Sequence, residues 1–380
     1  MAFLCYNRHM RRTFLYRLYP TAMQESALRH MLDECRWLYN HLLEERKTAW
    51  EERGASLSLY GQQETFGALK IQRPSLQGAH SQVLQNVAVR IDLAFKAFFR
   101  RVKAGEKPGF PRFRGYQRYD SFCYPQEGRK GGYHVDGDTV YLSKIGDVPI
   151  TLHRPIEGTI KTCCVKRSSS GKWFVTFSCE VSDQAAPDAP KDAVGIDVGL
   201  ASFATLSTGE AIPNPRFFRR DEHDLGRAQR RLSREAKGSA ARKKRRKVVA
   251  RIHERIANRR KNFAHQHSRK IVNRFKVICV EDLEINRMVH HHCLAKSISD
   301  AAWGQFSAYL AYKAACAGRQ FITVDPAYTS QTCSGCGHRH KMALAERTYH
   351  CLCCGLVIDR DHNAALNILA CGLASIGEEP

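Results

Sequence analysis

The hydrophobic and polar positions at the start of the chain predict one strand followed by two helices. Aromatic and apolar side chains alternate with polar ones over residues 13–19, as in a half-buried strand. Apolar residues then recur at helical spacing from Thr21, where Glu25 stands close to a capping arrangement, and again over residues 81–102. Residues 54–74 are interpreted as a polar connection between these helices.

Short alternating runs separated by turns continue over residues 133–181. Residues 159–166 and 173–181 flank the turn sequence Ser-Ser-Ser-Gly, so they predict a hairpin. Together with the first strand, these runs predict a β-barrel-like module that a helical insert divides. The expected boundaries are residues 1–20 and 105–190 for the β-barrel and 21–104 for the helical insert.

The second half of the chain opens with an apolar strand that contains one carboxylate. The composition of residues 184–191 predicts a linker before it. Residues 193–199 have the sequence Ala-Val-Gly-Ile-Asp-Val-Gly, so Asp197 lies among apolar residues. Residues 203–206 and 211–212 then predict a hairpin. A central strand that carries an aspartate and leads into a hairpin suits the ribonuclease-H-like folds.

Further segments complete this predicted domain. Residues 275–280 form a buried type of strand that ends at Glu281, and a helical pattern covers residues 300–317. Residues 319–325 predict one more strand, and a last helix runs from Asp361 through Leu369. We therefore expect a multidomain α/β plus β-barrel protein. The expected boundaries of its second half are residues 191–330 and 356–380 for the α/β domain and 331–355 for a cysteine-rich insert.

Composition and charge restrict the class of protein and its partners. The 380 residues suffice for two or three domains, and 43% hydrophobic residues indicate a folded protein. No apolar run approaches the ~18 residues of a membrane span, and the N-terminus lacks the features of a secretory signal. With 60 Lys and Arg against 37 Asp and Glu, the net charge of +23 indicates a polyanionic partner, either nucleic acid or an anionic membrane surface.

Residues 216–276 carry most of the excess positive charge. They hold 23 Lys and Arg against five Asp and Glu, and they include the run Arg242, Lys243, Lys244, Arg245, Arg246 and Lys247. The segment is predicted to be helical apart from Gly238-Ser239. A merely solvated helix usually mixes both signs of charge, because opposite charges four residues apart stabilise it. The single sign favours contact with a nucleic-acid backbone.

Residues 107–114 form a second basic segment, Lys-Pro-Gly-Phe-Pro-Arg-Phe-Arg, which includes Arg112 and Arg114. Phosphate-binding arginines beside aromatic rings suit a nucleic-acid strand whose bases stack on those rings. Alternatively, the aromatic residues anchor the loop to a core. The two interpretations are compatible.

The chain has 15 cysteines, most of which lie in apolar runs. We interpret residues such as Cys163, Cys164, Cys179 and Cys279 as small buried hydrophobic residues of a protein in a reducing cytoplasm, not as disulfide partners. The remaining motif has two Cys-x-x-Cys pairs that are 14 residues apart, which is zinc-ribbon spacing. The expected structural Zn²⁺ ligands are Cys333, Cys336, Cys351 and Cys354. Cys353 is a possible substitute for the last of them.

Three carboxylates are candidate ligands of a catalytic metal ion. Asp197, Glu281 and Asp361 are distant in sequence: Asp197 lies in the middle of an apolar strand, Glu281 ends a second strand and Asp361 opens the last helix. If they converge, their oxygens suit Mg²⁺, and two such ions activate water for phosphodiester hydrolysis. Each has an alternative, since Asp361 suits a helix cap and Asp197 suits a pair with a buried arginine. Asp359 is expected to point elsewhere, and Arg360 is expected to contact phosphate.

In these residues the sequence resembles the TnpB (OrfB-like) proteins of insertion sequences, which are compact relatives of type V CRISPR effectors. The resemblance follows the chain in order from end to end and is most specific near the C-terminus. The matching stretches are residues 18–21, 35–40, 110–113, 195–199, 280–283, 299–303, 328–337 and 359–368.

The resemblance implies an RNA-guided DNA endonuclease with a RuvC-type, Mg²⁺-dependent site. By position, Asp197, Glu281 and Asp361 match the catalytic carboxylates of the family. The cysteine-rich insert matches its target-nucleic-acid-binding zinc ribbon, the β-barrel its wedge domain and the helical insert its recognition domain. The implied partners are a transposon-derived guide RNA and double-stranded target DNA. The expected nucleic-acid contacts are Arg112, Arg114, residues 242–247, Ser330, Gln331 and Arg360.

Two other functions stay open at this point. A guided repressor would bind the same RNA and DNA without cutting, and a transposase would join DNA ends without RNA. We expect a monomer without a membrane partner, located in the cytoplasm of a prokaryote and associated with the nucleoid.

Overall fold

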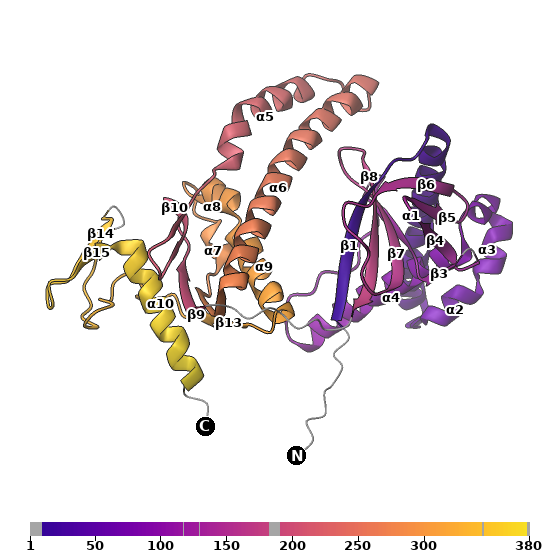
Figure 1. The fold of residues 1–380 in the computed structure, drawn as a ribbon. Coiled ribbons are helices and arrows are strands. Elements are labelled where there is room, and N and C mark those ends of the chain that lie inside the picture. Colours follow the sequence, from indigo (N-terminus) through magenta and orange to yellow (C-terminus); the bar gives the residue numbers. More distant parts are fainter. Residues whose placement is uncertain (1–9, 117, 129, 182–190, 344–345, 378–380) are drawn as a thin grey trace, which may run out of the picture. The chain divides into compact units, whose positions relative to one another are not determined.

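The computed structural model describes the chain except for residues 1–9, 117, 129, 182–190, 344–345 and 378–380 (Figure 1). Internal contacts divide the chain into two compact units, Met1–Asp183 and Gln184–Pro380. The predicted linker lies outside the described residues up to its last member, Lys191, which begins a strand of the second unit.

The first unit contains an eight-stranded sheet that curls into the predicted barrel. Its order is β2-β7-β8-β1-β6-β5-β4-β3. The first strand pairs with the last over its whole length, from Met10 opposite Val181 to Leu18 opposite Trp173. Alternate residues such as Tyr16 and Phe177 are buried inside. The strands are β1 Met10–Leu18, β2 Ser121–Tyr124, β3 Gln126–Glu127, β4 Gly132–Asp136, β5 Thr139–Leu142, β6 Gly146–Thr151, β7 Thr159–Arg167 and β8 Trp173–Val181.

The helical insert of this unit differs from the prediction in two details. Thr21 caps the first helix together with Gln24, not Glu25, because each of the two side chains binds the other residue's backbone N–H, at 3.3 and 3.0 Å. Residues 54–74 also contain helices and are not only a polar connection. The helices are α1 Ala22–Arg53, α2 Leu59–Glu64, α3 Phe66–Gln72, the 3₁₀ helix Pro74–Gly78 and α4 Ser81–Lys103.

One cysteine interpretation is wrong in this unit. Cys164 is not a free hydrophobic residue, because it forms a disulfide with Cys123. The two residues lie directly opposite each other on the antiparallel strands β2 and β7, with their Cα atoms 4.0 Å apart. Cys163 and Cys179 are free and buried, as predicted.

The second unit is built on a five-stranded sheet with the order β11-β10-β9-β12-β13. The strands β9, β12 and β13 are parallel, and β10 and β11 add the predicted hairpin on the other side of β9. This is the arrangement expected for a ribonuclease-H-like domain. The strands are β9 Lys191–Asp197, β10 Ser202–Leu206, β11 Ala211–Pro213, β12 Phe275–Glu281 and β13 Gln320–Val324.

Helices cover both faces of this sheet (Figure 1). On one face, α10 packs on Cys279 and Val324, and on the other face α6 and α9 enclose Phe203 and Phe306. The helix predicted over residues 300–317 is divided by Ala302, which has a positive φ of 57°. The helices are α5 Phe217–Ser233, α6 Ala240–Arg274, α7 Ile285–Met288, α8 Ala295–Ala301, α9 Trp303–Cys316 and α10 Arg360–Gly377.

A cysteine-rich segment lies between β13 and α10. It contains one short antiparallel pair, β14 Thr348–His350 and β15 Val357–Asp359. Among the helices that the structure describes, none combines the length and the apolar composition that a membrane span requires.

Helix α10 approaches the sheet closely because two glycines leave room for it. A Cβ atom on Gly195 of β9 would overlap the carbonyl oxygen of Ala365, and one on Gly372 of α10 would overlap the Sγ atom of Cys279. These contacts set the height of α10, and therefore of Asp361 in its first turn, above β9 and β12.

We expect Gly372→Ala to destabilise the second unit by about 1–3 kcal/mol, because the added methyl group forces α10 away from β12. The matched control is Gly377→Ala in the same helix, where nothing lies within 4 Å of an added Cβ atom. Its stability should stay equal or rise slightly, since alanine favours helix. Urea unfolding followed by circular dichroism measures both variants, and equal midpoints would contradict the close approach.

Candidate active site and metal centre

The second unit brings the three predicted carboxylates to one end of its sheet. Asp197 ends β9 and Glu281 ends the parallel neighbour β12, directly after the paired residues Ile196 and Val280. Because parallel strands finish at the same edge, both side chains belong to that edge. Asp361 lies in the first turn of α10, which packs across β9. The sequence prediction of a shared location therefore has a topological basis.

Asp197 shows the electrostatic consequence of this convergence. Burial raises the pKa of its carboxyl group to about 8, and the negative charges of Glu281 and Asp361 add to the increase. Within the described part of the chain Asp197 forms no ion pair, and Arg360 acts on it only as a neighbouring charge that lowers the pKa. The alternative of a structural pair with a buried arginine therefore has no support.

Glu281 is held by a residue that sequence reasoning missed. The hydroxyl group of Thr329 donates a hydrogen bond to Glu281 Oε1 at 2.6 Å, and Thr329 is itself buried. Burial raises the pKa of Glu281, and this hydrogen bond opposes the increase because it stabilises the charged form. Thr329 lies in the loop after β13, and no local pattern indicates its role, since the contact spans 48 residues.

Asp361 does not cap α10, because Asp359, two residues earlier, does. The backbone N–H of His362 donates to Asp359 Oδ1 at 2.9 Å, so Asp359 satisfies the start of α10. Asp361 lies 3.8 Å from Arg347 Nη1 in a partly exposed ion pair. Burial raises the pKa of Asp361, Asp359 adds to the increase, and Arg347 and Arg360 oppose it.

These three groups offer the oxygen ligands that a hard divalent cation takes, although among the described residues only the four cysteines below bring their ligand atoms within 4.8 Å of one another. Three acidic side chains with raised pKa values lie together at the edge of a sheet, and the one that is most deeply placed has no basic partner. Such an arrangement destabilises the charged forms unless a cation compensates them. Carboxylate oxygens are the ligands that Mg²⁺ prefers, together with water and phosphate oxygens.

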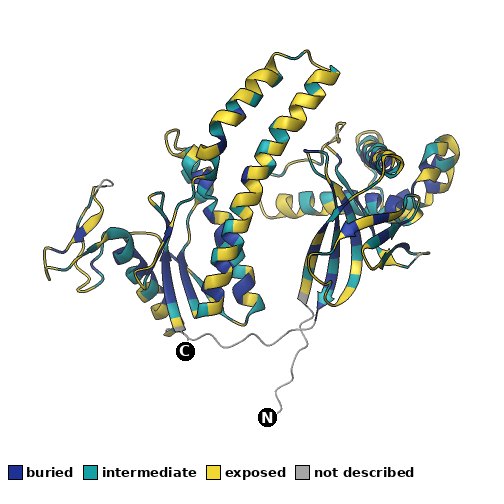
Figure 2. Ribbon diagram, turned by 45° about the horizontal axis from the view of Figure 1, so that its top comes forward, coloured by how far each residue is buried: buried dark blue, intermediate teal, exposed yellow. Residues whose placement is uncertain are grey.

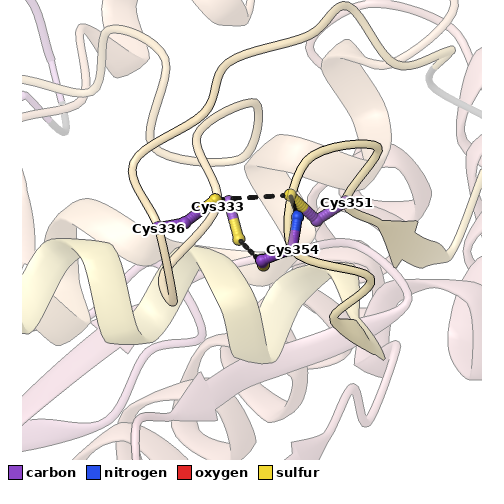
Figure 3. Close-up of side chains that lie close together, drawn as sticks. All are labelled: Cys333, Cys336, Cys351 and Cys354. Carbon is purple, nitrogen blue, oxygen red and sulfur yellow. Dashed lines mark hydrogen bonds between the residues drawn. The ribbon is translucent and has the colours of Figure 1, made fainter.

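The four predicted cysteines form a second donor set (Figure 3). The Sγ atoms of Cys333, Cys336, Cys351 and Cys354 all lie within 4.8 Å of one another. Two of these sulfur pairs are 3.6 and 3.5 Å apart, close to the about 3.8 Å that a tetrahedral Zn²⁺ site with ~2.3 Å bonds requires. Four thiolates leave no open position, so the cluster suits a structural zinc ion. Cys353 is exposed and lies outside the cluster.

Two asparagines of α10, also missed from the sequence, join the cysteine-rich segment to the helix that carries Asp361. Asn363 is buried, donates to the carbonyl oxygen of Thr332 at 2.7 Å and accepts from the N–H of Ser334 at 2.9 Å. Asn367 donates to the carbonyl oxygens of Thr329 and Thr332, at 2.7 Å each. Two asparagines four residues apart in an apolar helix are the sequence signal, because asparagine is a poor helix former.

Arg360 and its partners have structural contacts. The guanidinium of Arg360 donates to the carbonyl oxygens of Ala343 at 3.0 Å and Glu346 at 3.4 Å, and it lies 3.4 Å from Ser330 Oγ. The carbonyl oxygen of Gln331 accepts a hydrogen bond from the Tyr349 hydroxyl. Contacts of Arg360, Ser330 and Gln331 with nucleic acid stay a prediction.

The basic segment forms a helical hairpin, α5 and α6, whose outer parts are almost wholly exposed (Figure 2). One buried acid holds the helices together, since Asp221 binds Arg255 at 2.5 Å and Arg259 at 3.0 Å. Arg242 is also structural, because it donates to the carbonyl oxygens of Leu232 and Glu235 near the end of α5. Residues 243–247 are exposed, although Arg245 lies 3.5 Å from Glu235.

The loop of Arg112 and Arg114 belongs to the first unit, and both side chains are exposed. The backbone N–H of Arg114 donates to Asn40 Oδ1 at 2.7 Å, and its carbonyl oxygen accepts from Asn40 Nδ2 at 3.0 Å. The Arg114 guanidinium lies over the ring of Tyr39, 5.6 Å from its centre. The loop is thus fixed to α1 through its backbone.

Family models match three parts of the chain. Residues 176–291 match the OrfB family of IS605, described as "Probable transposase", and residues 303–368 match the Cas12f1-like TNB domain. Residues 10–55 match a helix-turn-helix domain, and in this structure they contain strand β1 and the single long helix α1.

Whole proteins and solved structures also match. A "Putative RNA-guided DNA endonuclease" of Streptomyces pristinaespiralis is 38% identical, covering 97% of this chain and 91% of the relative. "Putative RNA-guided DNA endonuclease InsQ" of Escherichia coli strain K12 is 32% identical, covering 95% and 92%. A Cas12f1 chain, solved with sgRNA and target DNA, has a TM-score of 0.61 over 95% of this chain and 98% of that chain at 15% identity. This likeness confirms the predicted fold class.

We expect the purified protein to contain about one zinc ion per chain. Cys333→Ser and Cys351→Ser should lose the ion, because each removes one of the four clustered thiolates. The matched control Cys353→Ser, outside the cluster, should keep it. Metal analysis by inductively coupled plasma mass spectrometry measures all three variants. Loss of zinc from the control, or retention by both cluster variants, would contradict the assignment.

Proposed function

This chain belongs to the OrfB-like family of transposon-encoded TnpB proteins, and from that premise we propose that it is an RNA-guided DNA endonuclease. Its partners are a guide RNA, derived from its own transposon, and double-stranded target DNA. The two relatives named as RNA-guided DNA endonucleases match nearly the full chain, which supports the same activity here.

The single observation that carries the proposal is the convergence of Asp197, Glu281 and Asp361 at one edge of the sheet. We assign these residues as the catalytic carboxylates that would hold Mg²⁺, with two ions as the expected number. When bound, Mg²⁺ supplies an activated water and stabilises the leaving oxygen of the phosphodiester. The protein contributes the fixed positions of the acidic oxygens.

Several residues of the chain keep those oxygens in place. Thr329 orients Glu281 through its hydrogen bond of 2.6 Å. The glycines at 195 and 372 set the depth of α10, and Asp359 caps this helix so that the carboxylate of Asp361 is not used for capping. Catalytic groups need such preorganisation, because errors of about 1 Å reduce rates by roughly a hundredfold.

Base pairing between guide and target reads the sequence in such enzymes, and the protein contacts the backbone and a short flanking motif. The exposed cations of α5 and α6 suit a phosphate backbone for this reason, since they carry charge without base-specific geometry. We further propose that residues 1–20 and 105–190 form the wedge domain and residues 21–104 the recognition domain. The zinc ribbon, at residues 331–355, would contact target nucleic acid, and residues 191–330 and 356–380 form the nuclease domain.

A transposase is the second candidate function, and the family description "Probable transposase" is what favours it. An RNase-H-like site with three carboxylates would look similar in both cases. A requirement for RNA separates them, because a transposase acts on transposon ends without a guide. The guided repressor is disfavoured, since all three carboxylates are present and interact.

We expect Asp197→Ala to abolish DNA cleavage while guide RNA binding persists. The matched control is Asp192→Ala on the same strand, where the side chain is 92% exposed and pairs with Lys276. It should cut like the wild type. The assay uses plasmid DNA, Mg²⁺ and the RNA that co-purifies with the protein when it is expressed with its native flanking DNA. Full cutting by the Asp197 variant would refute the site, and cutting by RNA-free protein would favour a transposase.

We expect Thr329→Val to reduce the cleavage rate by about 10- to 100-fold, because Glu281 loses the hydroxyl group that orients it. Thr329→Ser keeps the hydroxyl group and should restore most of the rate. Single-turnover cleavage with saturating guide RNA measures the effect, and equal RNA affinity of both variants shows that the fold is intact. Equal rates for the valine and serine variants would show that the hydrogen bond does not position Glu281.

A further inference from the structure

The first unit contains an open pocket of about 460 Å³ that lies outside the carboxylate and cysteine sites described above. It lies between the end of α1, the turn after it, the second half of α4 and the loop that follows α4. Its volume is in the range of small-molecule sites. Five aromatic residues contribute to its walls: Trp50, Phe95, Phe98, Phe99 and Phe110.

The aromatic rings of the pocket pack against one another, but several of them stay exposed to solvent. Phe110 meets Phe95 and Phe98 edge to face, with ring centres 5.6 and 5.5 Å apart, so the loop is anchored to α4 as one sequence interpretation proposed. Yet Trp50 is 65% exposed, Phe99 60% and Phe110 47%. Water-exposed aromatic faces that line one cavity indicate a flat apolar ligand.

The polar groups of the pocket are few. Arg46 is nearly buried and lies over the ring of Phe95, 5.2 Å from its centre. Its Nε atom donates to Gln62 at 2.7 Å, but its Nη2 atom, 3.6 Å from Asp92, has no hydrogen-bond partner among the described residues. Lys47, Glu51 and Ser56 complete the polar lining. A ligand that is flat and aromatic and carries hydrogen-bonding edges fits this lining.

The charge of the segments around the pocket indicates which class of molecule supplies such a ligand. Residues 96–118, which include Phe98, Phe99 and Phe110, hold eight Lys and Arg against one Glu. A phosphate backbone that follows these cations passes beside the pocket. A nucleobase inside a duplex is covered on both faces by its neighbours, whereas an unpaired base presents a free face for stacking.

We propose that this pocket binds one unpaired nucleobase of the nucleic acid that the protein carries. The inference rests on the proposed function, because it takes the ligand from a bound RNA or DNA strand. Trp50 and Phe99 stack on the base, and the surrounding cations hold its phosphates. Stacking of this kind tolerates any base, since every base has a π-face.

The test compares strands that differ only in their bases. Fluorescence anisotropy measures the binding of labelled oligonucleotides of about 15 nucleotides, the order of a single-strand site. One series contains adenine and the other contains abasic sugars, each as RNA and as DNA. The protein is the full chain with Asp197→Ala, freed of co-purified RNA, in buffer without divalent ions so that no strand is cut.

For Trp50→Ala and Phe99→Ala, we expect about 5- to 100-fold weaker binding of the adenine strand and unchanged binding of the abasic strand. Both residues are largely exposed, so folding should be preserved. The matched control is Leu93→Ala, which is also on α4 and 58% exposed but outside the pocket lining, and it should bind like the parent protein. The larger effect in the RNA or the DNA arm identifies the source of the base.

Three results would overturn the inference. Equal losses for adenine and abasic strands would mean that the aromatic residues act without base stacking. No loss for either pocket variant would mean that the rings do not contact the strand. A drop from dimer to monomer on Trp50→Ala, measured by light scattering, would assign the pocket to a second copy of the chain. By contrast, a parent protein that binds none of the oligonucleotides would contradict the proposed function itself.

Discussion

The repulsion of the Asp197 carboxylate by the charges of Glu281 and Asp361 is the interaction on which the rest of the second unit depends. Burial and these two neighbouring charges disfavour the charged form of Asp197, so the fold must hold the three acids together. Two parallel strands fix the first two positions, and a helix pressed onto the sheet by glycine contacts fixes the third. The sheet, the helix and the loop of Thr329 thus form one scaffold, which holds the acids together against that repulsion.

Local patterns predicted this scaffold well, because alternation and apolar runs report burial along one segment. The hairpin of β7 and β8 and the strand that ends at Glu281 follow directly from such runs, whereas β9 ends at Asp197 and does not carry it in its middle as predicted. Contacts between distant segments carry no local signal, so the role of Thr329 and the disulfide of Cys164 were not predicted. The residue that caps the first helix together with Thr21 was predicted one position too late, as Glu25 in place of Gln24.

For the basic hairpin of α5 and α6, composition and structure each supply a different part of the evidence for a polyanionic partner. The sequence alone indicates a polyanionic partner, since positive charge dominates residues 216–276. The structure adds that some of these cations serve the hairpin itself. Asp221 binds Arg255 and Arg259, and Arg242 binds the end of α5. The exposed remainder, and not the whole count, is the surface that a phosphate backbone meets.

The asparagines of α10 have a consequence for engineering. Asn363 and Asn367 bind the backbone of residues 329–334 from the same helix that presents Asp361. The zinc ribbon is therefore not an interchangeable cassette, although its sequence is compact. A shortened or transplanted zinc ribbon needs to keep these amide contacts. Without them, α10 loses contacts that hold its first turn, and with it Asp361, in place. Miniaturisation of this scaffold is limited by that shared helix more than by chain length.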